Sequence, residues 1–378
     1  MDNIVPLEKG KYLIHLLEGE DDASKIYLDR YGKITESIRA IQERVEKGAM
    51  VDSAREAIDE FTHKVEEMIK VESDTKKIEY LKEILDKNPI VYLNDHGPNH
   101  SRKVIEKVSE MLWYFKDGHL SKYESFILLC AIQFHDIGNI YGREDHEKRI
   151  KEIIESDFKT LFPDSIEKRV IEKIAMVHGG KILDDKDTIS RLSIVKPLFE
   201  KKVRKRLLAA LLRFGDELAD DSSRADKLGI ELGIITPSSE IHHYYSSSLH
   251  TVNIREDAEN NNLFLDLHYE FESDIIDKKF NTIEGEKYLL DEIYDRTLKM
   301  ERERRYCMRF MRQHISLEKI RVEIIIQDKN DCWNYKKITY TLEENGYPLT
   351  PQSGSLANLV PNIMSSEEAI SYFKKGLR

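Results

Sequence analysis

The residues best suited to chemistry in this chain are the adjacent pair His135-Asp136, which ends the apolar run 128–134 and stands just before Gly138. A helix of such apolarity is expected to be buried on nearly every side. Placing an imidazole and an ionised carboxylate at the end of a buried helix is costly unless another charge compensates them. A divalent metal ion is one such compensator, so we interpret His135-Asp136 as part of a metal site.

Two other residues are candidate ligands of the same ion. Pro98 follows a turn at 94–97 and is expected in the first turn of a helix, which places His100 at the start of that helix. Asp216 lies on a second apolar helix, three positions after Arg213 and on the same face. An internal ion pair between Arg213 and Asp216 is the structural alternative to a ligand role. A buried carboxylate on an apolar helix is nevertheless what a metal site requires.

The four candidate ligands are His100, His135, Asp136 and Asp216. Two imidazoles and two carboxylates suit a borderline divalent ion such as Mn, Fe, Ni, Co or Zn, and suit Mg less comfortably. Their order along the chain resembles the HD superfamily of metal-dependent phosphohydrolases, whose pattern is a His, an adjacent His-Asp and a distant Asp on a later helix. The resemblance covers about residues 91–235, with Phe-His-Asp-Ile-Gly around the central pair and Leu-Leu-Arg-Phe-Gly-Asp around Asp216.

The resemblance implies a mostly helical core around one or two metal ions. It also implies hydrolysis of a nucleotide or related phosphate ester by a metal-activated water. Members that hold two ions use additional histidines, and His146 and His178 stand in the right order for a second metal or for acid–base chemistry. The expected contacts to the substrate phosphate are His96, Lys181 and Arg213.

The chain departs from two branches of the superfamily. It lacks the His-His pair and the Gly-Tyr-Pro triplet of the cyclic-dinucleotide phosphodiesterases, which argues against that substrate. It also has Asn139 where the branch that cleaves nucleoside triphosphates often has a His. His146 or His178 would then have to replace the missing acid–base group.

The elements around these residues predict a mostly α (α+β overall) fold. Apolar residues at helical spacing predict N-terminal helices over 1–90, with one stripe at 34–45 and a second at 54–68. The HD-type core is expected at 91–235. Strict alternation at 263–271, 320–326 and 338–342, with a long helix at 285–314, predicts an appended domain of ββαββ order over 236–345. A tail with a short terminal helix, capped by Ser365, is expected at 346–378.

Composition excludes several classes of protein. The 378 residues include 40% hydrophobic and 34% charged residues, and no apolar run approaches the roughly 20 residues that span a bilayer. The N-terminus lacks a basic start followed by an apolar segment, and Cys130, Cys307 and Cys332 are scattered. These features predict a cytoplasmic protein without membrane attachment. The net charge of −11 disfavours broad nucleic-acid binding.

Three functional hypotheses follow. The first is the phosphohydrolase, with a small-molecule nucleotide or phosphate ester as its partner. The second is an HD-type nuclease on single-stranded nucleic acid, motivated by the basic stretches 201–206 and 302–312 but not favoured by the overall charge. The third is a non-catalytic nucleotide-sensing or scaffold module, in which the helices and the appended domain contact partners or form a homo-oligomer.

Overall fold

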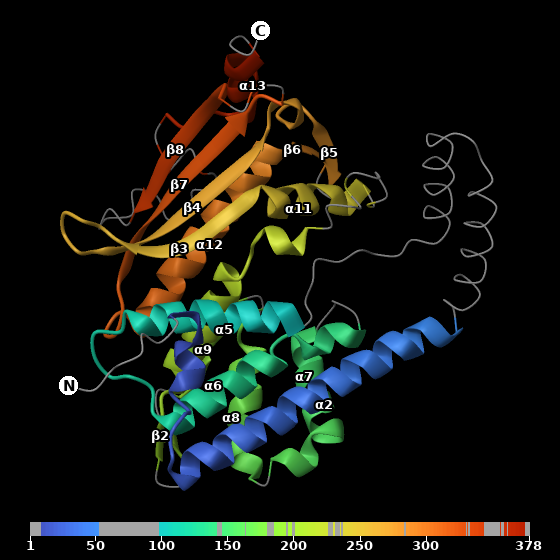
Figure 1. The fold of residues 1–378 in the computed structure, drawn as a ribbon, viewed down its shortest axis with the longest axis vertical. Helices are drawn as coiled ribbons and strands as arrows, with labels where there is room; N and C mark the ends of the chain where they lie inside the picture. Colours follow the sequence, from blue (N-terminus) through green and yellow to red (C-terminus); the bar gives the residue numbers. More distant parts are fainter. Residues whose placement is uncertain are drawn as a thin grey trace.

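The protein is described from a computed structural model. It describes residues 9–52, 98–141, 146–162, 164–179, 185–193, 196–198, 201–225, 237–282, 285–329, 333–343 and 362–374, with the single positions 230, 235, 331, 356, 359 and 360. Two units are visible in Figure 1, a helical unit that contains the N-terminal half of the chain and a sheet unit that contains the C-terminal half.

The helical unit is formed by consecutive helices that share one hydrophobic core. Its α-helices are α1 (Tyr12–His15), α2 (Asp22–Asp52), α5 (Pro98–Trp113), α6 (Lys122–Phe134), α7 (His146–Asp157), α8 (Ser165–Met176) and α9 (Lys205–Leu218). Short 3-10 helices connect the larger elements of both units: η1 (Lys9–Lys11), η2 (Ile137–Tyr141), η3 (Lys159–Leu161), η4 (Ile189–Arg191), η5 (Ser222–Arg224) and η6 (Ser273–Ile275). A small hairpin, β1 (Lys196–Leu198) with β2 (Lys201–Val203), precedes α9.

Helix α6 lies in the middle of this unit, as its apolar sequence predicts. Ser121 caps its N-terminus together with Glu124, and nearly all of its side chains are buried, including Phe126, Leu128 and Ile132. It contacts α2, α8, α9 and α5, so it is enclosed by helices on several sides. The helix therefore ends in the interior, with His135 as its C-cap residue.

The sheet unit has the predicted ββαββ order. Its strands are β3 (Leu249–Glu256), β4 (Leu263–Glu272), β7 (Leu317–Gln327) and β8 (Tyr335–Glu343), hydrogen-bonded in the order β3-β4-β7-β8. Its helices are α11 (Pro237–Ser248), α12 (Leu289–Met311) and α13 (Ser366–Lys374), and β5 (Lys279–Thr282) pairs with β6 (Gly285–Tyr288). Strands β4 and β7 are parallel, since α12 connects them, while the outer pairs are antiparallel.

Alternating residues of the strands account for the layers of this unit. In β4, Leu265, Leu267 and Tyr269 are buried, while Asp266 and His268 between them are partly exposed. Helix α12 lies against one face of the sheet, as Figure 1 shows. The prediction of a mostly helical, α+β fold is confirmed.

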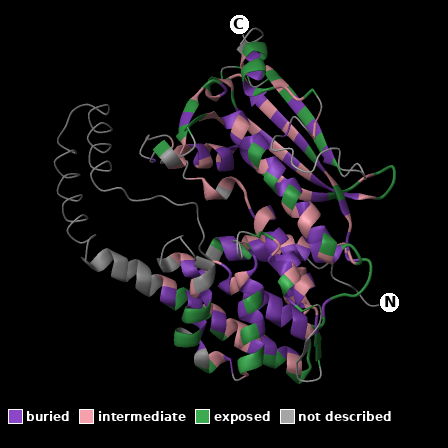
Figure 2. Cartoon of the chain, turned by 180° about the vertical axis from the view of Figure 1, so that it is seen from behind, coloured by how far each residue is buried: buried purple, intermediate pink, exposed green. Residues whose placement is uncertain are grey.

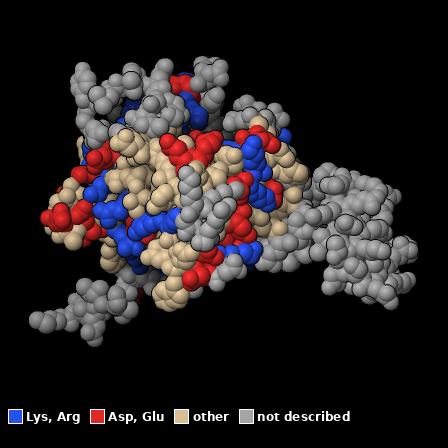
Figure 3. Space-filling view, turned by 90° about the horizontal axis from the view of Figure 1, so that it is seen from above, with Lys and Arg blue, Asp and Glu red and all other residues tan. Residues whose placement is uncertain are grey.

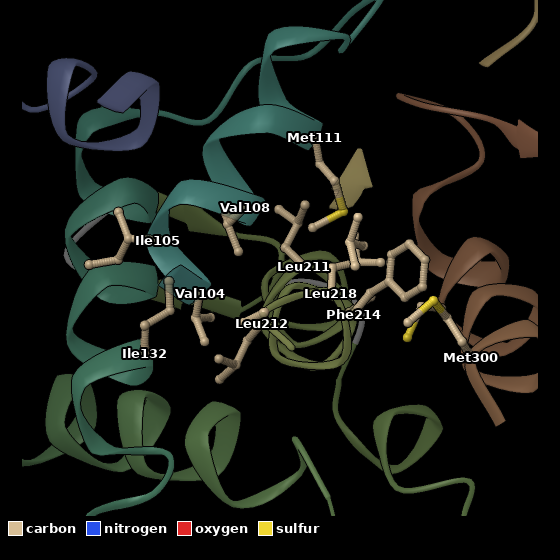
Figure 4. Close-up of a cluster of buried hydrophobic side chains, with 14 of the residues drawn as sticks. Val104, Ile105, Val108, Met111, Ile132, Leu211, Leu212, Phe214, Leu218 and Met300 are labelled. Carbon is tan, nitrogen blue, oxygen red and sulfur yellow. The ribbon is translucent and has the colours of Figure 1, made fainter. Parts of the chain in front are cut away.

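The described residues of the two units contact each other at several places, of which two involve α9 and α5. Helix α12 packs along α9, where Met300 lies beside Phe214 in the apolar cluster of Figure 4. Helix α5 lies against the edge strand β3: Lys107 donates to the carbonyl of Val252, and the backbone N–H of Ile254 donates to Glu110 over 3.0 Å. Buried residues run through both units in Figure 2.

Some details differ from the prediction. The long helix begins at Leu289 rather than at Gly285, because residues 285–288 form β6, and it ends at Met311. The hairpins β1–β2 and β5–β6 and the helix α11 were not predicted. The cap at Ser365 is confirmed by reciprocal hydrogen bonds with Glu368. The predicted apolar stripe at 54–68 lies outside the described residues. Among the described helices, none combines the length and the apolarity needed to cross a membrane.

Candidate metal centre

Three helices bring His100, His135 and Asp216 to one point. His100 is in the first turn of α5, His135 caps α6 and Asp216 is in the last turn of α9. Nε2 of His100 lies 2.9 Å from Oδ1 of Asp216 and 3.3 Å from Nε2 of His135. Nε2 of His135 is in turn 3.6 Å from Oδ1 of Asp216.

Asp136 completes this cluster. Its Oδ2 lies 3.6 Å from Nε2 of His100 and 3.5 Å from Nε2 of His135. His100, His135 and Asp136 each offer one ligand atom, and these atoms lie within 4.8 Å of one another. The structure thus brings together all four residues that the sequence predicted as ligands.

His178 lies next to the four residues. Its Nε2 is 3.7 Å from Oδ1 of Asp136, and its ring meets that of His135 edge to face with 4.9 Å between centroids. It follows the end of α8, where Val177 is the C-cap residue. Of the two histidines predicted for a second metal or for acid–base chemistry, this one therefore contacts Asp136. His146 begins α7, and its side chain lies outside the described part of the chain.

The orientation of two imidazoles is fixed by the ends of their helices. Nδ1 of His135 is 2.6 Å from the carbonyl oxygen of Ile132, and Nδ1 of His178 is 2.6 Å from that of Ala175. A carbonyl can only accept, so Nδ1 carries the proton in both rings. The last carbonyls of a helix lack intrahelical partners, which makes them available for this purpose. The Nε2 atoms are therefore the ones directed at the carboxylates and suited to bind an ion.

The electrostatics of the cluster favour a positive charge at its centre. Burial opposes protonation of His135, but the carboxylates of Asp136 and Asp216 outweigh it and raise its pKa from 6.5 to about 9. Burial would raise the pKa of Asp216, yet its hydrogen bonds to His100 and His135 hold that pKa well below its usual range. The cluster thus stabilises a cation, which can be a proton or a metal ion.

The distances also suit one shared ion. Two ligand atoms about 2.1 Å from a metal lie about 3.0–3.4 Å apart when the angle between them is about 90–110°. From Nε2 of His100 and His135 to the neighbouring ligand atoms the distances run from 2.9 to 3.6 Å, which requires only small adjustments. The residues present therefore fit a divalent metal by donor type, by spacing and by the direction of the imidazoles.

The three residues predicted to contact phosphate have different positions. His96 and Lys181 lie outside the described residues. Arg213 is buried and donates to both oxygens of Glu303 on α12, over 2.7 and 2.8 Å, and to the hydroxyl of Thr188. Its carboxylate partner is thus Glu303 and not Asp216. The ion pair that the sequence suggested between Arg213 and Asp216 is not formed, and Arg213 instead connects α9 with α12.

One ion pair between α9 and α12 was missed in the sequence. Lys299 of α12 lies 2.7 Å from Glu217, the residue that follows Asp216 on α9. On α12, lysines and arginines alternate with acids over 291–305, and such a pattern is typical of a solvent-exposed helix face. Only the packing of α12 on α9 shows that Lys299 contacts Glu217.

The basic stretches behind the nuclease hypothesis have intramolecular partners. Arg204 binds Glu124, Arg304 is buried against Glu301 and the carbonyl of Leu317, and Arg309 lies 3.6 Å from Asp187. In the view of Figure 3, Lys and Arg side chains are interspersed with Asp and Glu. Among the described residues of this face, acidic side chains therefore interrupt the basic ones.

Comparison with known proteins identifies a matching family. The model of the family described as HD-CE matches residues 90–299, which is more than half of the 378 residues. The match includes all four candidate ligands and extends past residue 235 into α12. No curated protein and no solved structure matches the chain.

Proposed function

The chain belongs to the HD-CE family, and from this premise we propose that it is a divalent-metal-dependent phosphohydrolase that cleaves a nucleotide or a related phosphate ester. The observation that carries the proposal is the convergence of His100, His135, Asp136 and Asp216 from three helices on one buried point. Scattered, buried cysteines at positions 130 and 307 agree with the cytoplasm as its proposed compartment.

The ion would be held by the Nε2 atoms of His100 and His135 and by the carboxylates of Asp136 and Asp216. When bound, a divalent metal lowers the pKa of a water ligand and neutralises charge on a phosphoryl group. The protein orients the imidazole of His135 through the carbonyl of Ile132 and keeps the rings of both histidines buried. His178, beside Asp136, is the candidate to exchange a proton with the reacting groups or to bind a second ion.

The access to this centre is from the side of Asp216. The side chains of His135, His100 and Asp136 are 0%, 2% and 10% exposed, while that of Asp216 is 29% exposed. A substrate therefore approaches the ion past the last turn of α9.

The first test is elemental analysis of the purified protein, followed by assays of nucleotides, cyclic nucleotides and simple phosphate esters with the identified metal restored. Asp136→Ala should lose both the metal and the hydrolysis. A matched control is Asp185→Ala, because Asp185 is an exposed residue whose ion pair with Arg191 spans 3.6 Å. Full activity of the Asp136→Ala variant would overturn the proposal.

The same assays separate the alternatives. Tight nucleotide binding without any product would favour the nucleotide-sensing module. Release of nucleotides from single-stranded DNA or RNA, with free nucleotides left intact, would favour the nuclease. In both cases the Asp136→Ala variant shows whether the metal is required.

A further inference from the structure

The carbonyl of Val177 at the end of α8 has a partner outside the helix, the buried side chain of Thr188. The hydroxyl of Thr188 donates to this carbonyl over 3.0 Å. Val177 is the C-cap residue of α8, and its carbonyl shares a planar peptide group with the N–H of His178. That N–H donates to the carbonyl of Ala175 over 3.4 Å. The peptide group that precedes the ring of His178 is therefore held at both of its polar ends.

Thr188 does not use its hydroxyl as a residue in its position usually does. It directly precedes the 3-10 helix η4, and a threonine before a helix commonly caps the first N–H groups with its side chain. Thr188 makes no such capping hydrogen bond, and its hydroxyl instead contacts Val177, 11 residues earlier in the chain. The hydroxyl therefore stabilises the end of α8 and not the start of η4.

Arg213 fixes the direction of this hydroxyl group. Its Nη1 lies 3.1 Å from Oγ1 of Thr188. A guanidinium can only donate, so Oγ1 accepts from Arg213 and its single proton is left for the carbonyl of Val177. Arg213 is itself held by both carboxylate oxygens of Glu303 on α12, over 2.7 and 2.8 Å. A continuous series of hydrogen bonds thus runs from α12 through Arg213 and Thr188 to the peptide group of His178.

Tyr306 of α12 holds the same segment by a second route. Its hydroxyl accepts from the backbone N–H of Ile189 over 2.9 Å and donates to Oδ1 of Asp187 over 2.9 Å, so it contacts the residues on both sides of Thr188. The guanidinium of Arg213 lies over its ring, with 4.6 Å from Cζ to the ring centroid. Helix α12 of the sheet unit therefore holds the segment that carries Thr188.

We propose that Thr188 is a positioning residue for the metal centre and that it sets the direction of the ring of His178. Nε2 of His178 lies 3.7 Å from Oδ1 of Asp136, and its ring meets that of His135 with 4.9 Å between centroids. A displacement of about 1 Å in a reacting group can lower a rate about 100-fold. The part of His178 in hydrolysis rests on the proposed function, whereas the placement of its ring by Thr188 does not.

The placement is tested by NMR on the full-length protein with labelled histidines, saturated with the diamagnetic ion Zn²⁺. The observable is the nuclear Overhauser effect between the ring protons of His135 and His178, which His178→Ala identifies by its disappearance. Thr188→Val keeps the size of the side chain but removes the hydroxyl, and it should lose most of this signal. Thr188→Ser retains the hydroxyl and should retain the signal.

Thr297→Val is the matched control for the loss of a buried hydroxyl. Thr297 donates to the carbonyl of Tyr294 over 3.0 Å and lies 2.8 Å from the hydroxyl of Tyr340, so its partners belong to α12 and β8. This variant should keep the signal. Tyr306→Phe loosens the segment around Thr188 without changing Thr188 itself; it should weaken the signal, and it decides the outcome if Thr188→Val does not fold.

Three results would overturn the inference. They are a wild type without the signal between His135 and His178, an unchanged signal in Thr188→Val or, if that variant does not fold, in Tyr306→Phe, and an equal loss in Thr297→Val.

Kinetics with a substrate found in the assays above provide a second measurement. Thr188→Val should lower kcat about tenfold or more while the metal content is unchanged. If Thr188 acts through His178, adding Thr188→Val to His178→Ala should cause no further loss. Losses that add in the double variant would contradict a positioning role, because they would show that Thr188 acts independently of His178.

The results also distinguish this inference from the proposed function. If the NMR signal depends on Thr188 but no ester is cleaved, the hydrolase proposal fails and the positioning role stands. If the wild type cleaves an ester and Thr188→Val keeps both the signal and kcat, the hydrolase proposal stands and the role of Thr188 is rejected.

Discussion

His100 and Asp216 are 116 positions apart in the chain, yet Nε2 of the first lies 2.9 Å from Oδ1 of the second. The contact depends on how α5 crosses α9, since each residue lies near the end of its helix. Any change that separates these helices must therefore weaken the candidate metal centre, even if it leaves the four ligands in place.

The first prediction concerns the charge of Asp216. Asp216→Asn keeps the size of the side chain but removes the negative charge that would bind the ion. We expect the affinity for the metal to fall by at least about tenfold, the lower end of the losses seen even for groups that only support ligands. Competition with a chelator, followed by elemental analysis, measures this change. Asp221→Asn is the control, because Asp221 pairs with Lys103 at 2.8 Å and should leave metal binding unchanged.

The second prediction concerns Gly215, which faces α5. A Cβ atom at this position would lie 2.5 Å from Cγ2 of Val108 and 3.6 Å from Cγ1 of Val104. Valine has few accessible rotamers, so the helices would have to move apart. Gly215→Ala should therefore lower the free energy of unfolding by about 1–3 kcal/mol and weaken metal binding. Denaturant titration and elemental analysis measure the two effects.

Two further variants test the cause. Adding Val108→Ala to Gly215→Ala removes the methyl group that clashes and should recover part of the metal affinity. Gly32→Ala is the control, because its Cβ would meet nothing within 4 Å and alanine is the better helix former. If Gly215→Ala binds metal like the wild type, the close approach of α5 and α9 is not required for the site.

The third prediction concerns Glu124, which joins the starts of α6 and α9. Its Oε2 accepts from Nη2 of Arg204 over 2.8 Å, and its Oε1 accepts from the backbone N–H of the same residue over 3.0 Å. Burial would raise the pKa of Glu124, but these hydrogen bonds outweigh it and lower the pKa below the ordinary 4.5. The carboxylate thus stabilises the fold above pH 4.5, and this contribution is lost as the pH falls through the lower pKa of the folded state.

Glu124→Gln should therefore lower the free energy of unfolding by about 1.5–3 kcal/mol near neutral pH. The difference from the wild type should shrink progressively below pH 4.5. Urea titrations followed by circular dichroism, near pH 7 and near pH 4, measure it. Glu286→Gln is the control, because it removes only the exposed ion pair with Lys279. Its free energy of unfolding should match that of the wild type at both pH values. A constant difference at both pH values would contradict the assignment.

The sequence allowed much of the site to be predicted, because its ligands have local signatures. His135 and Asp136 interrupt an apolar run, and Asp216 stands on a helix whose other face is apolar, so burial could be inferred from neighbouring residues. The strands were predicted for the same reason, since alternation at 263–271 is a local pattern. Helix α12 differs from the predicted helix 285–314 only in its ends. Gly285 has a positive φ, and residues 285–288 pair with β5 instead of starting the helix.

What could not be predicted are contacts between distant charged side chains. Asp216 stands three residues after Arg213, where it could form an ion pair within the helix. No pattern in the sequence indicates that Arg213 pairs with Glu303, 90 residues later, instead. Lys299 belongs to a run of mixed charges that is the same whether the helix faces solvent or α9. The parallel pairing of β4 with β7 likewise depends on how α12 crosses the sheet.

The hydrogen bonds from Nδ1 of His135 and His178 to carbonyls three residues earlier have a consequence for the rate of metal exchange. Both rings lose their rotational freedom and their choice of tautomer when the chain folds, so neither has to reorganise when an ion arrives. The rate of loading is then governed by the loss of water from the ion, by the loss of the Nε2 proton of His135 and by passage past Asp216. A slowly dehydrating ion such as Ni²⁺ should accordingly enter more slowly than Mn²⁺ or Zn²⁺, whatever its final affinity.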